Sequence, residues 1–182
     1  MEDLSLHILD IVENAVSARA RKIEIRVTEE PGEDRLTIEI RDDGMGMEEE
    51  VSQKALDPFF TTRSSRRVGL GLSLMAQAAR EAGGSLRIES KPGRGTTVTA
   101  IFQYHHIDRK PLGNMTETMT TLLLGNPDLE IFYTHRKEEK SYELSSPLLK
   151  NLFKDRPFID PEVIQWVKTH LKEGLERIGV RG

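Results

Sequence analysis

Asp10 and Asn14 are the first residues of this chain whose types and spacing could do chemistry. If the segment around them is helical, two residues four positions apart share one face. A carboxylate and an amide one turn apart suit a hard cation such as Mg2+, or they can orient an attacking hydroxyl and accept its proton. A solvated polar helix face would show the same pattern, so the pair alone leaves both interpretations open.

A second group of such residues follows an alternating apolar segment. Leu36 to Ile40 alternates like a half-buried strand, and the pattern breaks at Asp42-Asp43-Gly44-Met45-Gly46. Glycine lets the backbone approach a ligand closely, and Asp42 can accept a hydrogen bond from an exocyclic amine such as that of adenine. Asp-Asp-Gly also marks ordinary tight turns, which is the alternative interpretation of this group.

The third group combines a phenylalanine-containing segment, a basic segment and two glycines at the start of a helical pattern. It runs from Asp57-Pro58-Phe59-Phe60-Thr61-Thr62-Arg63 through Arg66 and Arg67 to Gly69-Leu70-Gly71-Leu72-Ser73. Backbone N–H groups at a helix start favour phosphate, while the arginines either contact phosphate or are simply solvated. Leu74 stands where a dinucleotide fingerprint needs its third glycine, and no P-loop sequence occurs anywhere in the chain.

Taken in order, these groups resemble the ATP-binding motifs of the GHKL superfamily: gyrase B, Hsp90, the histidine kinases and MutL. The N box corresponds to Ile8–Ala20, the first glycine box to Asp42–Met47 and the phenylalanine box to Leu56–Thr62. Gly69–Ser73 corresponds to the second glycine box, and Gly93–Thr96 to the closing glycine-threonine segment. The resemblance covers about residues 4 to 103. It implies an α+β fold, a two-layer α/β sandwich called the Bergerat fold, with a mixed sheet covered by helices.

The resemblance also implies a role for particular residues. Asn14 would ligate Mg2+, Asp42 would bind the adenine amino group, and Asp10 would act as the catalytic base. Aspartate replaces the glutamate usual in ATP-hydrolysing members and is one methylene shorter, which puts hydrolysis in doubt. The remaining nucleotide-binding residues implied are Gly44, Gly46, Thr62, Arg63, Gly69, Leu70, Gly71, Leu72 and Thr96.

Helical periodicity predicts a first helix from Leu4 to about Ala20, with an apolar stripe at Leu6, Leu9, Val12 and Val16. His7 on this helix is expected to be a structural histidine with its hydrogen bonds satisfied, with a role near the phosphates as the alternative. A second helix is predicted from Gly69 through Ala82. A hairpin of strands at 85–90 and 96–104 follows it.

Residues 105–182 are predicted to form an α/β extension of the ATP-binding domain, which would occupy residues 1–104. We expect a helix at 111–124, strands at 129–136 and 141–144, and helices at 147–153 and 161–178. Trp166, on the last of these helices, is expected to be buried in the protein core, and the alternative is a role as an interface anchor. His105 and His106, if on a strand, would face opposite ways, which argues against joint metal binding.

Composition limits the function classes. The chain has 182 residues, 37% of them hydrophobic, and no cysteine, so a globular cytoplasmic protein without a disulfide framework is expected. No apolar run approaches the roughly 20 residues that cross a bilayer, so no membrane association is expected. Residues 1–104 carry 14 Lys and Arg against 18 Asp and Glu, and the remainder is neutral, so there is no basic excess for nucleic acid.

Two functions fit these patterns. In the first, Mg-ATP is bound and its γ-phosphoryl group passes to a partner protein or slowly to water. In the second, the nucleotide switches a protein-interaction surface without catalysis. Only three residues precede Leu4, so we expect no phospho-accepting two-helix segment like that of sensor kinases. The chain resembles instead a stand-alone catalytic domain of the anti-sigma-factor kinase type.

Overall fold

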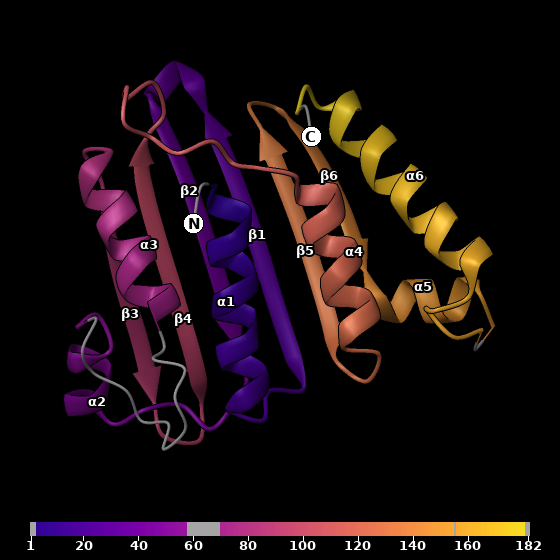
Figure 1. The fold of residues 1–182 in the computed structure, drawn as a ribbon, viewed down its shortest axis with the longest axis horizontal. Coiled ribbons are helices and arrows are strands. Elements are labelled where there is room, and N and C mark those ends of the chain that lie inside the picture. The colour runs from indigo at the N-terminus through magenta and orange to yellow at the C-terminus, as the bar shows by residue number, and fades with distance from the viewer. Residues whose placement is uncertain (1–2, 58–69, 155, 181–182) are drawn as a thin grey trace.

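The computed structural model describes residues 3–57, 70–154 and 156–180. The chain folds into a six-stranded mixed sheet with helices on one face (Figure 1). The strand order is β3-β4-β2-β1-β5-β6, and β1 pairs with β5 in parallel while all other pairs are antiparallel. The strands are β1 (Lys22–Glu30), β2 (Arg35–Asp42), β3 (Ser85–Lys91), β4 (Gly95–Gln103), β5 (Glu130–Lys137) and β6 (Lys140–Ser145). This arrangement confirms the predicted α+β sandwich.

The central strand β1 was not predicted, although its sequence carries the signal. Ile23, Ile25 and Val27 are fully buried under the helices, and the alternate residues Lys22, Glu24 and Arg26 face the other way. Glu24 forms ion pairs with Lys22 (2.9 Å) and Arg26 (3.0 Å) on that second face. A strand with one apolar and one charged face is typical of a sheet that is covered on one side only.

Helices α1 (Leu4–Ser17), α3 (Leu70–Glu81) and α4 (Met115–Gly125) lie in front of the sheet in Figure 1. Asp3 begins α1 by accepting a hydrogen bond from the backbone N–H of Leu6 at 3.2 Å, as an N-cap residue does. The shorter helices are α2 (Glu49–Lys54) and α5 (Ser146–Leu152), and α6 (Pro161–Arg177) packs beside α4. A short 3-10 turn, η1 (Pro31–Glu33), joins β1 to β2.

The apolar stripe predicted for α1 is wrong in part. Leu6 and Val16 are each 40% exposed. The buried face is instead Leu4, Ile8, Ile11, Val12 and Ala15, which contacts the sheet. The predicted stripe lies along one flank of this face, because residues spaced by three drift around a helix of 3.6 residues per turn.

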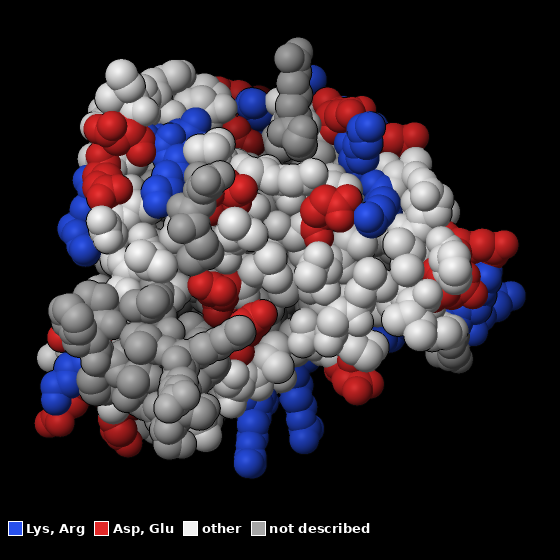
Figure 2. Space-filling model, in the orientation of Figure 1, with Lys and Arg blue, Asp and Glu red and all other residues white. Residues whose placement is uncertain are grey.

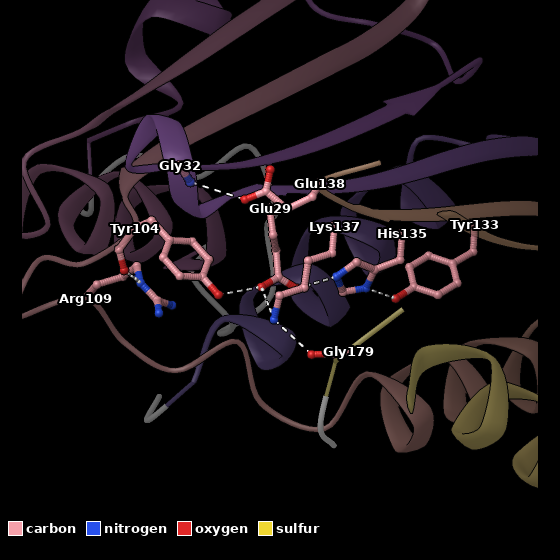
Figure 3. Close-up of polar contacts among 9 residues, drawn as sticks. All are labelled: Glu29, Gly32, Tyr104, Arg109, Tyr133, His135, Lys137, Glu138 and Gly179. Carbon is pink, nitrogen blue, oxygen red and sulfur yellow. Dashed lines mark hydrogen bonds and ion pairs between the residues drawn. The ribbon is translucent and has the colours of Figure 1, made fainter. Parts of the chain in front are cut away.

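Residues 105–182 continue the sheet, because β5 pairs with residues 22–29 of β1. A buried chain of hydrogen bonds joins the two strands (Figure 3). Tyr133 Oη lies 2.7 Å from His135 Nδ1, and His135 Nε2 lies 2.7 Å from Glu29 Oε1. Tyr104 donates to the other oxygen of Glu29 at 2.9 Å. Burial raises the pKa of Glu29, but the contacts with His135, Tyr104 and Lys137 outweigh it and hold that pKa below its usual value.

Helix α4 begins four residues later than predicted. Asn114 caps it by accepting from the N–H of Glu117 at 3.0 Å. The residues before the cap are used elsewhere, because the carbonyls of Pro111 and Leu112 accept from the first backbone N–H groups of α1. The strands β3 and β4 and the hairpin β5–β6 agree with the predicted segments within two residues.

Two predictions, for Trp166 and His7, are wrong, and the condition placed on His105 and His106 is not met. Strand β4 ends at Gln103, so His105 lies in a turn, where its Nδ1 lies 2.9 Å from Asp34 Oδ1. Trp166 is 37% exposed and stacks on His170 with ring centroids 4.6 Å apart, so it is outside the core. His7 is fully buried, but neither ring nitrogen has a hydrogen-bond partner within the part of the chain that the structure describes.

Among the described residues, no helix combines the length and the apolar character that crossing a membrane requires. On the helix-bearing face shown in Figure 2, acidic and basic side chains are interspersed, and the described residues form no continuous basic stripe.

Candidate functional site

Helix α1 carries the first two candidate residues, and α3 lies directly against one of them. Asp10 is partly buried, and burial together with the nearby Glu13 raises the pKa of its carboxyl group. A Cβ atom on Gly71 would lie only 2.6 Å from Cβ of Asp10, so only glycine fits there without displacement. Asn14, also partly buried, follows one turn later on the same helix.

Asp42 ends strand β2 in the middle of the sheet. In register it lies between Ile23 of β1 and Thr96 of β4. Its Oδ1 accepts the backbone N–H of Gly44 at 2.8 Å, and the N–H of Thr96 also donates to its carboxylate. Burial raises the pKa of Asp42 in spite of these two donors. A carboxylate has about four acceptor positions, so it can accept a further donor from a ligand.

Residues 42–47, which we call the 42–47 loop, are held between the end of α1 and the β3–β4 hairpin. Met45 donates its backbone N–H to the carbonyl of Ala18 at 2.8 Å, and its own carbonyl accepts from Gly93 at 2.7 Å. The backbone N–H of Met47 donates to Ser90 Oγ at 2.8 Å. The loop is therefore fixed by main-chain contacts on two sides.

Two glycines make this packing possible. Gly46 has φ +67°, and a Cβ there would lie 2.0 Å from the carbonyl oxygen of Lys91. Gly95 has φ +80°, and a Cβ there would lie 2.0 Å from the carbonyl oxygen of Asp42. Both positions need the left-handed conformation that glycine adopts without strain, so no larger residue fits.

Helix α1 connects the two halves of this arrangement. Gly71 touches it at Asp10, and the 42–47 loop touches it at Ala18, where a Cβ on Gly44 would lie 2.8 Å from the carbonyl oxygen. Asn14 lies midway, about 6 Å along the axis from each at 1.5 Å per residue. Helix α1 thus contacts the start of α3 at Asp10 and the loop after Asp42 at Ala18, and Asn14 lies between these two contacts.

The other predicted residues are placed less completely. Thr96 is the second residue of β4, and its Oγ1 lies 2.8 Å from Ser90 Oγ, a partner that the sequence patterns gave no reason to select. Leu72 is partly buried against the core, and Leu70 is the first residue of α3. Thr62, Arg63 and Gly69 lie outside the described residues, as do Arg66 and Arg67.

A magnesium ion here would depend on few protein ligands. The described residues contain no group of three or more His, Cys, Asp or Glu side chains arranged to hold a metal. Mg2+ usually keeps several waters and binds through one or two protein oxygens together with substrate phosphates. The amide oxygen of Asn14 fits that donor pattern.

Comparison with known proteins agrees with this geometry. The family model described as "Histidine kinase-, DNA gyrase B-, and HSP90-like ATPase" matches residues 2–106. The signal transduction histidine-protein kinase AtoS of Escherichia coli is 36% identical over 110 residues, which are 60% of this chain and 17% of AtoS. The sensor histidine kinase YkoH of Bacillus subtilis is 34% identical over 97 residues, 50% of this chain and 21% of YkoH. The chain therefore spans only about a fifth of these relatives.

Solved structures show the same fold. The MutL ATPase domain of Aquifex aeolicus, complexed with ADP, has a TM-score of 0.53 at 18% identity, and the match covers 85% of this chain and 70% of that one. The N-terminal domain of a DNA repair protein has a TM-score of 0.56 at 16% identity, covering 80% of this chain and 53% of that one. Because the family model matches more than half of the sequence, the chain belongs to the histidine kinase-, DNA gyrase B- and HSP90-like ATPase family.

Proposed function

We propose that this protein binds Mg-ATP between α1 and the 42–47 loop and transfers the γ-phosphoryl group to a partner protein, or slowly to water. The observation that carries the proposal is the carboxylate of Asp42, which is partly buried at the end of a central strand between glycines that no other residue could replace. A carboxylate with spare acceptor capacity suits the exocyclic amine of adenine. The histidine kinases that match this chain support the phosphoryl-transfer step.

Each candidate residue then has one task. Asp42 accepts a hydrogen bond from the base, and Gly44 and Gly46 leave room for it. Asn14 supplies an oxygen ligand for Mg2+, which neutralises charge on the phosphates when it is bound. Gly71, in the first turn of α3, lies beside the phosphates. Gly69, Leu70 and Leu72 belong to the same sequence motif, and Thr62 and Arg63 precede it in the sequence, so we assign them to the same part of the site.

Asp10 orients the attacking group and accepts its proton. The pKa of its carboxyl group is raised toward neutral pH, which makes the carboxylate a stronger base than that of an exposed aspartate. It is one methylene shorter than glutamate, so it reaches less far toward a water molecule. We therefore expect slow hydrolysis and place transfer to a protein side chain first.

The alternative is a nucleotide-gated interaction switch. The observation that favours it is the continuous path from the loop to the extension: Asp42 pairs with β1, and β1 pairs along its length with β5. A shift of the loop on nucleotide exchange would reach β5 through one intervening strand. Residues 105–182 would then form the surface to which a protein partner binds.

Incubation with γ-labelled ATP and Mg2+, with and without lysate of the source cells, separates the two functions. Label on a partner protein supports the kinase, and nucleotide-dependent association without labelled protein supports the switch. Asp10→Asn should stop turnover and keep ATP binding, whereas Asn14→Ala should abolish the Mg-dependent part of binding. Full turnover by Asp10→Asn would contradict the role of Asp10.

A further inference from the structure

We propose that Asp43 is a positioning residue, which ties the 42–47 loop to the end of α1 and thereby sets the preference of the site for adenine. The inference rests on the proposed nucleotide site and concerns a residue to which the motif comparison gives no role. Asp42 and Asp43 are adjacent in sequence, but we assign the carboxylate of Asp42 to the base and that of Asp43 to positioning the loop.

The Asp43 carboxylate is bound by the protein itself. Its Oδ1 accepts the backbone N–H of Arg21 at 2.7 Å and that of Lys22 at 2.9 Å. The backbone N–H of Asp43 donates to the carbonyl of Lys22 at 3.3 Å. Charge-assisted hydrogen bonds of this length are stronger than those between neutral groups, so the contact fixes the loop against residues 21 and 22.

The two amides lie in the connection between α1 and β1. The connection leaves α1 after Ser17 and turns at Arg19, which has φ 61°. Met45 binds the same connection from the other side through the carbonyl of Ala18. Gly44 therefore lies between two residues, Asp43 and Met45, that each form hydrogen bonds to this connection.

A third contact holds the loop from the opposite side. A Cβ on Gly95 would lie 2.9 Å from Cα of Asp43, so the β4 backbone packs directly on this residue. With β4 on one side and the α1–β1 connection on the other, Asp43 fixes the distance between Asp42 and the helix that carries Asn14. This distance must match the span between the base and the metal-bound phosphates in one nucleotide.

Selectivity follows from the fixed position of Asp42. Adenine presents an amino donor where guanine presents a carbonyl acceptor, so a carboxylate held in place favours one and repels the other. N–H···O hydrogen bonds have donor–acceptor distances of about 2.7–3.2 Å and weaken steeply at angles below about 120°, so small movements of the carboxylate remove the discrimination. Residues 21 and 43 are exposed, and water can replace the lost acceptor, so the fold survives removal of the Asp43 side chain.

The test compares Asp43→Ala and Asp43→Asn with the parent by calorimetric titration of Mg-ATP and Mg-GTP. Asp34→Ala is the matched control, because Asp34 also accepts a backbone N–H, from His105 at 2.7 Å, but lies between β1 and β2 at the other end of the sheet. Loss of two hydrogen bonds should weaken ATP binding by about tenfold in Asp43→Ala and reduce the ATP-to-GTP preference by a similar factor. Asp43→Asn keeps an acceptor oxygen and should retain most of both, and Asp34→Ala should match the parent.

An unchanged ATP-to-GTP preference in Asp43→Ala overturns the inference, whatever happens to its affinity, because a merely structural role would weaken both nucleotides alike. If Asp43→Ala does not fold, Asp43→Ser retains a shorter acceptor and should show an intermediate loss of the ATP-to-GTP preference. An ATP-to-GTP preference equal to that of the parent in Asp43→Ser would also overturn the inference. A parent protein that binds no ATP overturns the proposed function itself, which is a distinguishable result.

Discussion

Replacement of His7 by leucine should stabilise the protein, and the gain should grow as the pH falls. His7 is fully buried without a partner for either ring nitrogen among the described residues, and burial, aided by the charge of Lys110, lowers its pKa from 6.5 to about 4. The folded state therefore keeps His7 neutral, whereas the unfolded chain takes up a proton below pH 6.5. Stability that is present above pH 6.5 is lost as the pH falls toward 4.

The magnitude follows from the size of the pKa shift. At 1.36 kcal/mol per pKa unit, the full shift corresponds to about 3 kcal/mol, of which roughly 2.5 kcal/mol is lost between pH 7.5 and 4.5. Leucine has no ring nitrogen to desolvate, so His7→Leu should also gain about 1 kcal/mol or more at neutral pH. The gain over the parent should then reach roughly 3–4 kcal/mol at pH 4.5.

Urea unfolding followed by circular dichroism at several pH values between 4.5 and 7.5 measures this difference. Subtracting the variant from the parent removes the contributions of Asp10, Asp42 and the other groups that titrate in both proteins. His106→Gln is the control, because it removes a histidine whose side chain is partly exposed. A His7→Leu variant whose unfolding free energy runs parallel to that of the parent across this range would refute the reasoning.

Three further predictions concern other contacts. Gly71→Ala should lower ATP affinity by at least about tenfold in a titration, because the added methyl group would lie 2.6 Å from Cβ of Asp10 and must displace α3 or the aspartate; unchanged affinity would show that this contact does not border the site. His135→Leu should cost about 3–5 kcal/mol of unfolding free energy in urea, because Glu29 loses a partner at 2.7 Å while staying buried, and a loss below about 1 kcal/mol would mean that the buried chain does not stabilise the β1–β5 pairing. Turnover should rise with pH with a midpoint above the ordinary aspartate value, since burial and Glu13 raise the pKa of Asp10, and a midpoint at or below that value would exclude Asp10 as the base.

The parts of the fold that could be predicted from the sequence are those with local signals. Strand β2 and the hairpin β3–β4 alternate clearly, and turn residues separate them. The α+β sandwich was implied by the resemblance of the ordered motifs to the GHKL superfamily, and two glycines of those motifs, at positions 46 and 95, adopt the left-handed conformation. Strand β1 carries the same alternation at Ile23, Ile25 and Val27, so the sequence contains a local signal for this strand as well.

Other features depend on contacts between distant segments and have no local signature. The buried face of α1 is set by how the helix lies on the sheet, which the spacing of Leu6 and Val16 could not reveal. The partners of Asp43 lie 21 and 22 residues away, and His135 and Glu29 are separated by 106 residues. Trp166 has helical spacing like the core residues around it but lies at the edge of the packed layer.

A crystal structure with Mg2+ and a non-hydrolysable ATP analogue tests the central claim most directly, because it locates the base and the metal in one experiment. The account predicts the adenine amino group within hydrogen-bond distance of the Asp42 carboxylate and the metal bound to the amide oxygen of Asn14. A nucleotide bound elsewhere, or one whose base and metal contact neither residue, would contradict it.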